Sequence, residues 1–230
     1  MDYEIIRINN DTWLIEEDGV RFFLLSGKER ALLIDSGMTV HNAREIAESL
    51  TKLPLSLLNT HADIDHIGSN AQFESFYMHP AEETNYRQSG GTGTIITIRE
   101  NDTLDLGGRE LEIIDLPGHT PGSIAVLDKS RRVLFSGDPI QAHGNIFMFG
   151  EHRNMRDYIA SLARLEERTD GFDEIWPSHA DFPVKPELIR RLRDSAERIL
   201  AGEIAGRPAA FHGQKITTYN LGFTTILCDR

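Results

Sequence analysis

Short apolar runs separated by turn residues open the chain and predict β-structure. Four such runs lie within the first 34 residues, and turn residues interrupt them at positions 9–11, 18–19 and 26–28. The runs are Tyr3–Ile8, Trp13–Glu17, Arg21–Leu25 and Ala31–Ile34. This spacing predicts a meander of antiparallel strands.

Helical spacing of apolar positions then alternates with further short strands. The predicted helices are Val40–Thr51, Pro80–Arg87, Met155–Arg168 and Pro186–Gly202. The predicted strands are Leu53–Leu58, Phe76–Met78, Arg109–Leu116, Ser123–Asp128, Val133–Ser136, Glu174–Trp176 and Phe223–Cys228. No linker or internal repeat divides the sequence, so we expect residues 1–230 to form a single domain. This order fits both a doubly wound parallel sheet and a two-sheet sandwich flanked by helices.

Composition and charge exclude several classes of function and partner. The 230 residues include 36 acidic and 24 basic side chains, for a net charge of −12, which argues against nucleic-acid or anionic-membrane partners. No apolar run reaches the roughly 18–20 residues of a membrane span, and the N-terminus lacks a signal-peptide pattern, so we expect a cytoplasmic protein. The oligomeric state stays open, a homo-oligomer included. Nine histidines against one cysteine suggest metal chemistry without thiolate ligands.

The densest group of candidate ligands follows the predicted strand Leu53–Leu58. His61, Asp63, Asp65 and His66 lie within six residues. In a loop at the end of a strand, alternate residues can point into one cleft, so His61 and Asp63 could serve one ion while Asp65 and His66 face a second. Three isolated candidates also follow predicted strands in turns rich in glycine, proline and serine, and these are His119, Asp138 and His179.

A calcium-binding loop is the first alternative for this segment. Asp63, Asp65, Gly68 and Glu74 match positions 1, 3, 6 and 12 of an EF-hand loop. Two other ligand positions hold Ile67 and Ala71, and no helix precedes the loop. The calcium interpretation therefore fails.

Together these residues resemble the metallo-β-lactamase superfamily, whose signature is H-x-H-x-D-H followed by isolated His, Asp and His ligands. The signature here reads His61-Ala-Asp-Ile-Asp-His66, and the segment Ile34–Gly37 resembles a family element that packs beneath the metal loop. The resemblance runs from about Ile34 to His179. It implies an α+β fold, an αββα sandwich of two β-sheets packed face to face with helices outside, and a dinuclear metal site on one edge.

Asp63 stands where this family usually has its second histidine. Carried over to this sequence, the family's ligand assignment gives one site of His61, Asp63 and His119. It gives a second site of Asp65, His66 and His179, with Asp138 bridging the two. The resemblance thus implies two divalent metal ions, with zinc favoured and iron or manganese as alternatives because the ligands are rich in oxygen. A single-metal site is also open.

Such a centre predicts a metal-dependent hydrolase acting on a small-molecule ester, thioester, lactone or phosphoester. A metal-bridging hydroxide would attack, and Asp65 is the expected catalytic residue that orients it. A non-haem iron oxidoreductase or dioxygenase on the same fold is the rival class, because flavodiiron relatives carry a carboxylate at the position of Asp63. A binding or sensor module is a third alternative, disfavoured by the complete set of seven ligands.

The loop after Asp138 offers candidate substrate contacts. Phe147, Met148 and Phe149 could form an apolar wall there or could pack into the core. His143 and Tyr158 are candidates for contacts to the oxyanion or the leaving group, and Asp181 is a candidate partner for an imidazole ligand.

Overall fold

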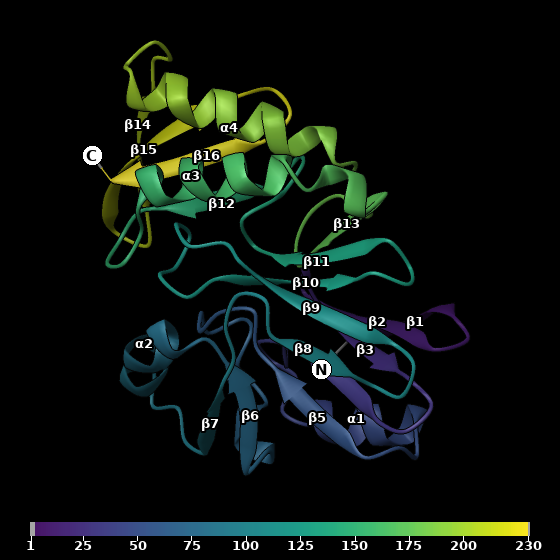
Figure 1. Ribbon diagram of the computed structural model, residues 1–230. Coiled ribbons are helices and arrows are strands. Elements are labelled where there is room, and N and C mark those ends of the chain that lie inside the picture. Colours follow the sequence, from purple (N-terminus) through teal and green to yellow (C-terminus); the bar gives the residue numbers. More distant parts are fainter. Residues whose placement is uncertain (1–2, 230) are drawn as a thin grey trace.

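The first half of the chain builds one seven-stranded sheet. The computed structural model describes residues 3–229, and the strands of this sheet follow one another in chain order (Figure 1). They are β1 (Tyr3–Asn9), β2 (Thr12–Glu17), β3 (Val20–Ser26), β4 (Ala31–Ile34), β5 (Leu55–Leu58), β6 (Ser75–Met78) and β7 (Thr94–Thr97). The first four strands pair antiparallel, and β4 to β7 pair parallel.

Two further sheets come from the rest of the chain, after β7. A five-stranded sheet has the order β13-β11-β10-β9-β8, and a four-stranded sheet has the order β12-β16-β15-β14. The strands of the first are β8 (Thr103–Asp105), β9 (Glu110–Asp115), β10 (Ile124–Asp128), β11 (Val133–Gly137) and β13 (Glu174–Pro177). Those of the second are β12 (Asn145–Met148), β14 (Arg207–Phe211), β15 (Gln214–Asn220) and β16 (Thr225–Asp229).

The longer helices pack against the faces of these sheets. Helix α1 packs on the seven-stranded sheet, and α3 and α4 lie side by side between the five- and four-stranded sheets (Figure 1). The helices are α1 (Ala43–Leu50), α2 (Glu83–Gln88), α3 (Met155–Glu166) and α4 (Glu187–Leu200), with single 3₁₀ turns at Asn70–Gln72, Pro80–Glu82 and Thr169–Gly171. Within residues 3–229, no helix is both long and apolar enough to cross a membrane.

Strand alternation divides the core into three layers. In β3, Phe23 faces the five-stranded sheet while its neighbour Phe22 faces α1. In β10, Val126 faces the seven-stranded sheet while Leu127 joins the layer beneath α3 and α4. The central strands of both sheets are therefore buried on two faces, which explains why they read as continuous apolar runs.

This arrangement confirms the predicted α+β sandwich and adds a sheet that the sequence pattern did not predict. Strand β12 lies in the segment that we expected to be a loop, and the β14–β15 hairpin had no predicted counterpart. Strands β7 and β8 were also not predicted. The helix expected over Val40–Thr51 is shorter and begins at Ala43, and the one expected over Pro80–Arg87 splits into a 3₁₀ turn and α2.

The strand directions bring the candidate ligands to one edge. Strands β4 and β5 are parallel and end side by side at Ile34 and Leu58. Strands β11 and β13 are also parallel, with Gly137 opposite Pro177. The two sheets are joined at this edge by a hydrogen bond of 2.9 Å from the Ile124 amide to the Thr60 carbonyl. Loops from both sheets therefore meet at the same place.

Candidate metal centre

All seven candidate ligands converge at this edge in two groups. Within each group, one ligand atom per residue lies within 4.8 Å of the others. The first group is His61, Asp63 and His119, and the second is Asp65, His66, Asp138 and His179. The fold thus brings residues up to 118 positions apart in the chain together in these two groups.

The first group is centred on one carboxylate oxygen of Asp63. Its Oδ2 lies 3.6 Å from Nε2 of His61 and 3.3 Å from Nε2 of His119. Both imidazoles are buried, whereas Asp63 is partly accessible. Two histidines and one carboxylate form a set that suits zinc and non-haem iron.

Asp138 lies between the two groups. Its Oδ1 is 3.1 Å from Nε2 of His66 and 3.2 Å from Nε2 of His179, while its Oδ2 is 3.6 Å from Nε2 of His119. Asp65 completes the second group, with Oδ2 3.2 Å from Nε2 of His179. One carboxylate thus presents an oxygen to each group, as a bridging ligand must.

Each imidazole is oriented through its other nitrogen. Nδ1 of His119 donates to the Phe147 carbonyl at 2.9 Å, and Nδ1 of His179 donates to the Gly19 carbonyl at 2.8 Å. A carbonyl can only accept, so both rings carry their proton on Nδ1 when neutral. Nε2 then keeps its lone pair and points into the group, which is the tautomer a metal ligand needs.

The other two imidazoles share one buried carboxylate. Asp35 accepts from Nδ1 of His66 at 2.9 Å and from the Thr60 hydroxyl at 2.8 Å. That hydroxyl has one proton to give, so it accepts in turn from Nδ1 of His61 at 3.0 Å. The Ile34–Gly37 segment therefore lies beneath the metal-binding loop and fixes the orientation of two ligands.

A metal fits the atoms that are left without partners. Nε2 of His61, His66 and His119 and Oδ1 of Asp138 are buried and have no hydrogen-bond partner. Buried polar atoms without partners are rare because each costs free energy. These four atoms point into the two adjacent ligand groups, where bound divalent cations would give each of them a partner.

The charges of the site also favour cations. Burial alone would raise the pKa of the Asp138 carboxyl. The neighbouring His179 and His66 lower it by more than burial raises it, so the pKa lies well below its usual range. Burial lowers the pKa of His179, yet Asp138 and Asp65 raise it to about 10. The carboxylates are thus ionised at neutral pH, and a metal that binds beside His66 and His179 would displace protons from these two imidazoles, because both of their pKa values are raised.

Two residues that the sequence pattern did not single out hold the site together. The fully buried carboxylate of Glu82 accepts from the Ala62 amide at 2.8 Å and from the Gly122 amide at 2.7 Å. It thereby joins the loop of His61 to the loop of His119. No sequence motif marks Glu82, because its role depends on two distant backbone amides.

Arg153 is the second such residue, and it contacts the unusual ligand Asp63. Its guanidinium donates to Asp63 Oδ2 at 2.5 Å, and its Nε is buried without a partner. The next residue, Asn154, begins α3 by accepting from the amides of Arg156 and Asp157. The start of α3 thus places a positive charge beside the first group.

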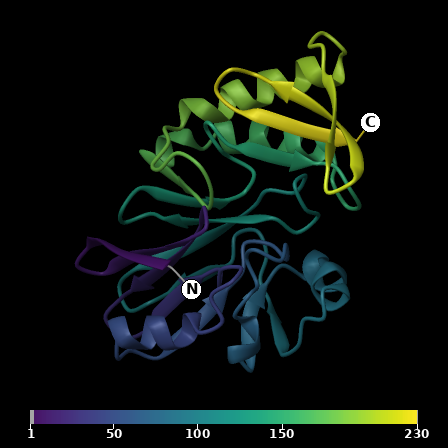
Figure 2. The same ribbon diagram turned by 180° about the vertical axis from the view of Figure 1, so that it is seen from behind.

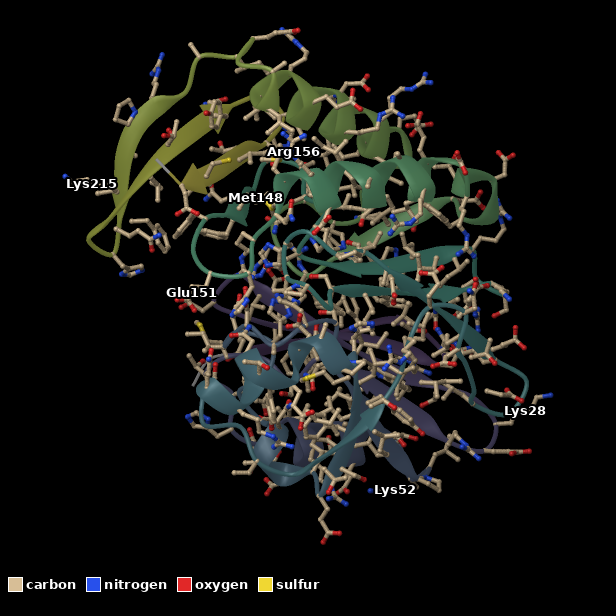
Figure 3. The ribbon with its side chains drawn as sticks, turned by 60° about the vertical axis from the view of Figure 1, so that its left-hand side comes forward. Lys28, Lys52, Met148, Glu151, Arg156 and Lys215 are labelled. Atoms are coloured by element: carbon tan, nitrogen blue, oxygen red, sulfur yellow. The ribbon has the colours of Figure 1, made fainter. Side chains whose placement is uncertain are left out.

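The candidate substrate contacts separate in the structure. Phe147 and Phe149 are partly exposed, whereas Met148 is buried in the core beneath α3 (Figure 3). Tyr158 is fully buried, and its hydroxyl donates to the Pro139 carbonyl at 2.7 Å. These positions remove Met148 and Tyr158 from the proposed substrate contacts, because both side chains are already committed to the protein interior.

His143 and Asp181 form an exposed pair with each other. Nδ1 of His143 lies 2.7 Å from Oδ2 of Asp181. The two residues follow the ligands Asp138 and His179 in their loops. Asp181 was expected to hold a ligand imidazole, but His179 is held by Gly19 instead.

Comparison with known proteins agrees with this geometry. A family model described as the metallo-beta-lactamase superfamily matches residues 15–179. Acyl-coenzyme A thioesterase MBLAC2 of Homo sapiens is 26% identical over 215 aligned residues, covering 73% of this chain and 77% of that protein. Hydroxyacylglutathione hydrolase of Gloeobacter violaceus is 31% identical over 191 residues, covering 76% of this chain and 74% of that protein.

Solved structures show the same fold. A metallo-beta-lactamase from Pontibacter korlensis superimposes with a TM-score of 0.73 at 19% identity, covering 85% of this chain and 99% of that one. The family match spans well over half of the residues and includes all seven candidate ligands. The chain therefore belongs to the metallo-beta-lactamase superfamily, as a metal-dependent hydrolase.

Proposed function

We propose that this protein hydrolyses a thioester of a small molecule at a centre of two divalent metal ions. The observation that carries the proposal is the position of Asp138, which presents one oxygen to His66 and His179 and the other to His119. Such a carboxylate would be shared by two cations, one in each group. The thioester class is supported by the relatives, which include an acyl-coenzyme A thioesterase and hydroxyacylglutathione hydrolases.

His61, Asp63 and His119 would hold one ion, and Asp65, His66 and His179 the other, with Asp138 shared. When bound, two divalent cations lower the pKa of water and polarise a carbonyl oxygen. In the overall reaction one water adds to the carbonyl carbon and the carbon–sulfur bond breaks. The products are a carboxylate, a thiol and one proton.

Asp65 is the proposed catalytic residue of this chain. Burial raises the pKa of its carboxyl, but the charge of His66 and hydrogen bonds from His179 and His66 lower it well below its usual range. An ionised Asp65 orients the attacking water by accepting a hydrogen bond. A thiol has a pKa near 8.5, so the leaving thiolate does not have to be protonated before the carbon–sulfur bond breaks. The reaction therefore needs no general acid for the leaving group.

A substrate panel tests the thioester assignment. We expect purified enzyme to show its highest kcat/KM on acyl thioesters, ahead of matched oxygen esters, lactones and phosphodiesters. His119→Ala should lose at least about a hundredfold in kcat, since loss of a ligand disables the metal that polarises the carbonyl. His41→Ala is the matched control, because His41 is exposed and lies outside both groups. Equal turnover of phosphodiesters and thioesters would contradict the assignment.

Iron-dependent oxidation is the second candidate function. The observation that favours it is the first group, in which two histidines and a carboxylate form the ligand set typical of non-haem iron. Anaerobic metal analysis combined with oxygen uptake separates the two functions. Two irons per chain with substrate-dependent oxygen consumption would replace the hydrolase proposal.

A further inference from the structure

Three phenylalanine rings gather at the junction of the four-stranded sheet and the metal centre. The ring centroids of Phe147 and Phe211 are 5.1 Å apart, and Phe149 lies 5.6 Å from each of them. Phe147 is in β12, Phe149 follows it, and Phe211 ends β14 more than 60 residues later. We call these three rings the aromatic cluster.

The aromatic cluster lies on the face of the sheet that α3 and α4 leave free. Ile146 and Met148 point into the core beneath these helices, so Phe147 between them points the other way. Phe147 pairs with Leu227, which is buried on the same face although it belongs to none of the three core layers. Figure 2 shows this sheet from behind, with no helix of residues 3–229 over that face.

The aromatic cluster is directly connected to the metal centre. The carbonyl of Phe147 accepts the hydrogen bond from Nδ1 of His119, so the backbone that carries the first ring also orients a ligand. The loop that follows Phe149 then reaches Arg153, which contacts Asp63. Both ends of the segment 147–153 therefore touch the first group of ligands.

The hairpin that contributes Phe211 is tied to the same loop. The carboxylate of Asp229 accepts from the Gly150 amide at 3.1 Å and from the Gln214 side chain at 3.2 Å. Figure 3 shows the hairpin end near Lys215 and the loop at Glu151 on the same side of the molecule. The side chain of Phe211 nevertheless keeps 37% of its surface exposed, so the cluster offers an apolar surface to solvent.

We propose that the aromatic cluster is the subsite for the apolar acyl chain of the substrate. This inference rests on the proposed thioesterase function and extends it, because it assigns the acyl part to medium-length alkyl chains. In this proposal the alkyl chain extends from the site past His119 to the rings, which the Phe147 carbonyl links to Nδ1 of that imidazole. The net charge of −12 and the uncharged rings favour a neutral chain over an acidic one at this surface.

The test compares thioesters that differ only in chain length. Acetyl, butyryl, hexanoyl and octanoyl thioesters of N-acetylcysteamine share one small neutral thiol, so their kcat/KM values report on the acyl subsite. Each methylene removed from water contributes up to about fourfold, so we expect the octanoyl thioester to exceed the acetyl thioester by at least about tenfold. Phe211→Ala and Phe149→Ala should each cut that ratio about fivefold.

Ile5→Ala is the matched control. Ile5 is 38% exposed, close to the value for Phe211, and lies on β1 at the other end of the molecule (Figure 1). The octanoyl-to-acetyl ratio of this variant should equal that of the unmodified protein. Two aromatic variants are used. If one of them fails to fold, the octanoyl-to-acetyl ratio of the other still tests the acyl subsite.

A non-hydrolysable ligand separates this inference from the proposed function. S-octyl-N-acetylcysteamine is a thioether that cannot be turned over, and calorimetry should show about fivefold weaker binding to Phe211→Ala than to the unmodified protein. If no thioester is hydrolysed, the proposed function fails, while the thioether still tests the subsite. Unchanged ratios and unchanged thioether affinity in both variants would overturn the inference. So would a dimer that Phe211→Ala converts to a monomer without altering either quantity.

Discussion

The pairing of Asp63 with Arg153 is the feature in which this site departs from the family pattern. Asp63 Oδ2 faces two ligand histidines and also accepts from the Arg153 guanidinium. Both side chains are largely buried, so each charge needs the other when no metal is bound. The usual histidine at position 63 would leave Arg153 without a carboxylate partner there.

A double-mutant cycle measures this pairing. In chelator-treated protein, Asp63→Asn should lower the free energy of unfolding by about 1–3 kcal/mol, because it leaves a buried guanidinium without a counter-charge. Arg153→Gln should destabilise similarly, and the double variant should recover part of the loss. Urea unfolding provides the values. Strictly additive losses would show that the two charges do not interact.

At this scale the sequence pattern predicted which candidate ligands lie together, but it did not predict most of the residues that support them. The spacing of His61, Asp63, Asp65 and His66 pointed to metal because four potential ligands rarely fall within six residues by chance. Asp35 entered only through family resemblance. Glu82 and Arg153 carry no local signal, since each acts on a group far away in the chain.

Among the elements, Glu82 most clearly shows how the fold positions the ligand loops, because its carboxylate binds a backbone amide of each loop. We call this pair of hydrogen bonds the Glu82 clamp. Its two carboxylate oxygens each take one backbone amide, from Ala62 and Gly122. These amides belong to loops that leave different sheets. A single side chain at the start of α2 therefore sets the distance between the two loops.

Glu82→Gln tests this clamp. A carboxamide has only one acceptor oxygen, so one of the two amides would face an NH₂ group instead. We expect the free energy of unfolding to fall by about 1–3 kcal/mol and metal affinity to weaken about 10–100-fold. The neighbour Glu83 is exposed, so Glu83→Gln should change stability by less than about 0.5 kcal/mol. Equal behaviour of the two variants would refute a clamping role.

Element prediction succeeded where burial follows the strand or helix period and failed where it does not. Strand β10 alternates between two buried layers and was predicted almost to the residue. Strand β14 is exposed throughout, so its sequence carries no apolar pattern. Strand β12 follows a glycine-containing turn and contains only four residues, which made it look like part of a loop.

For the whole molecule, the metal centre joins the two large sheets at one edge. Ligands His61 and His66 follow β5 of one sheet, whereas His119, Asp138 and His179 follow strands of the other. Bound ions would therefore connect the halves of the sandwich, and their binding free energy would add to the stability of the fold.

Chelation should consequently lower the melting temperature. An ion present at about 100 times its dissociation constant stabilises a protein by about 2.7 kcal/mol. A chain of this size shifts by about 2–4 °C per kcal/mol, so removing metal should lower Tm by about 5–10 °C. Differential scanning calorimetry with and without EDTA, followed by re-addition of zinc, checks this. A Tm that does not respond to chelator would argue against an intrinsic metal centre.

A metal titration of metal-depleted protein, followed by thioester turnover, tests the dinuclear hydrolase. We expect activity to be absent at first, to rise with added divalent metal and to saturate at two equivalents per chain. His61→Ala/His66→Ala should bind less than one equivalent tightly and stay inactive. Full turnover in metal-depleted protein, or metal content and turnover retained by the double variant, would contradict the dinuclear hydrolase.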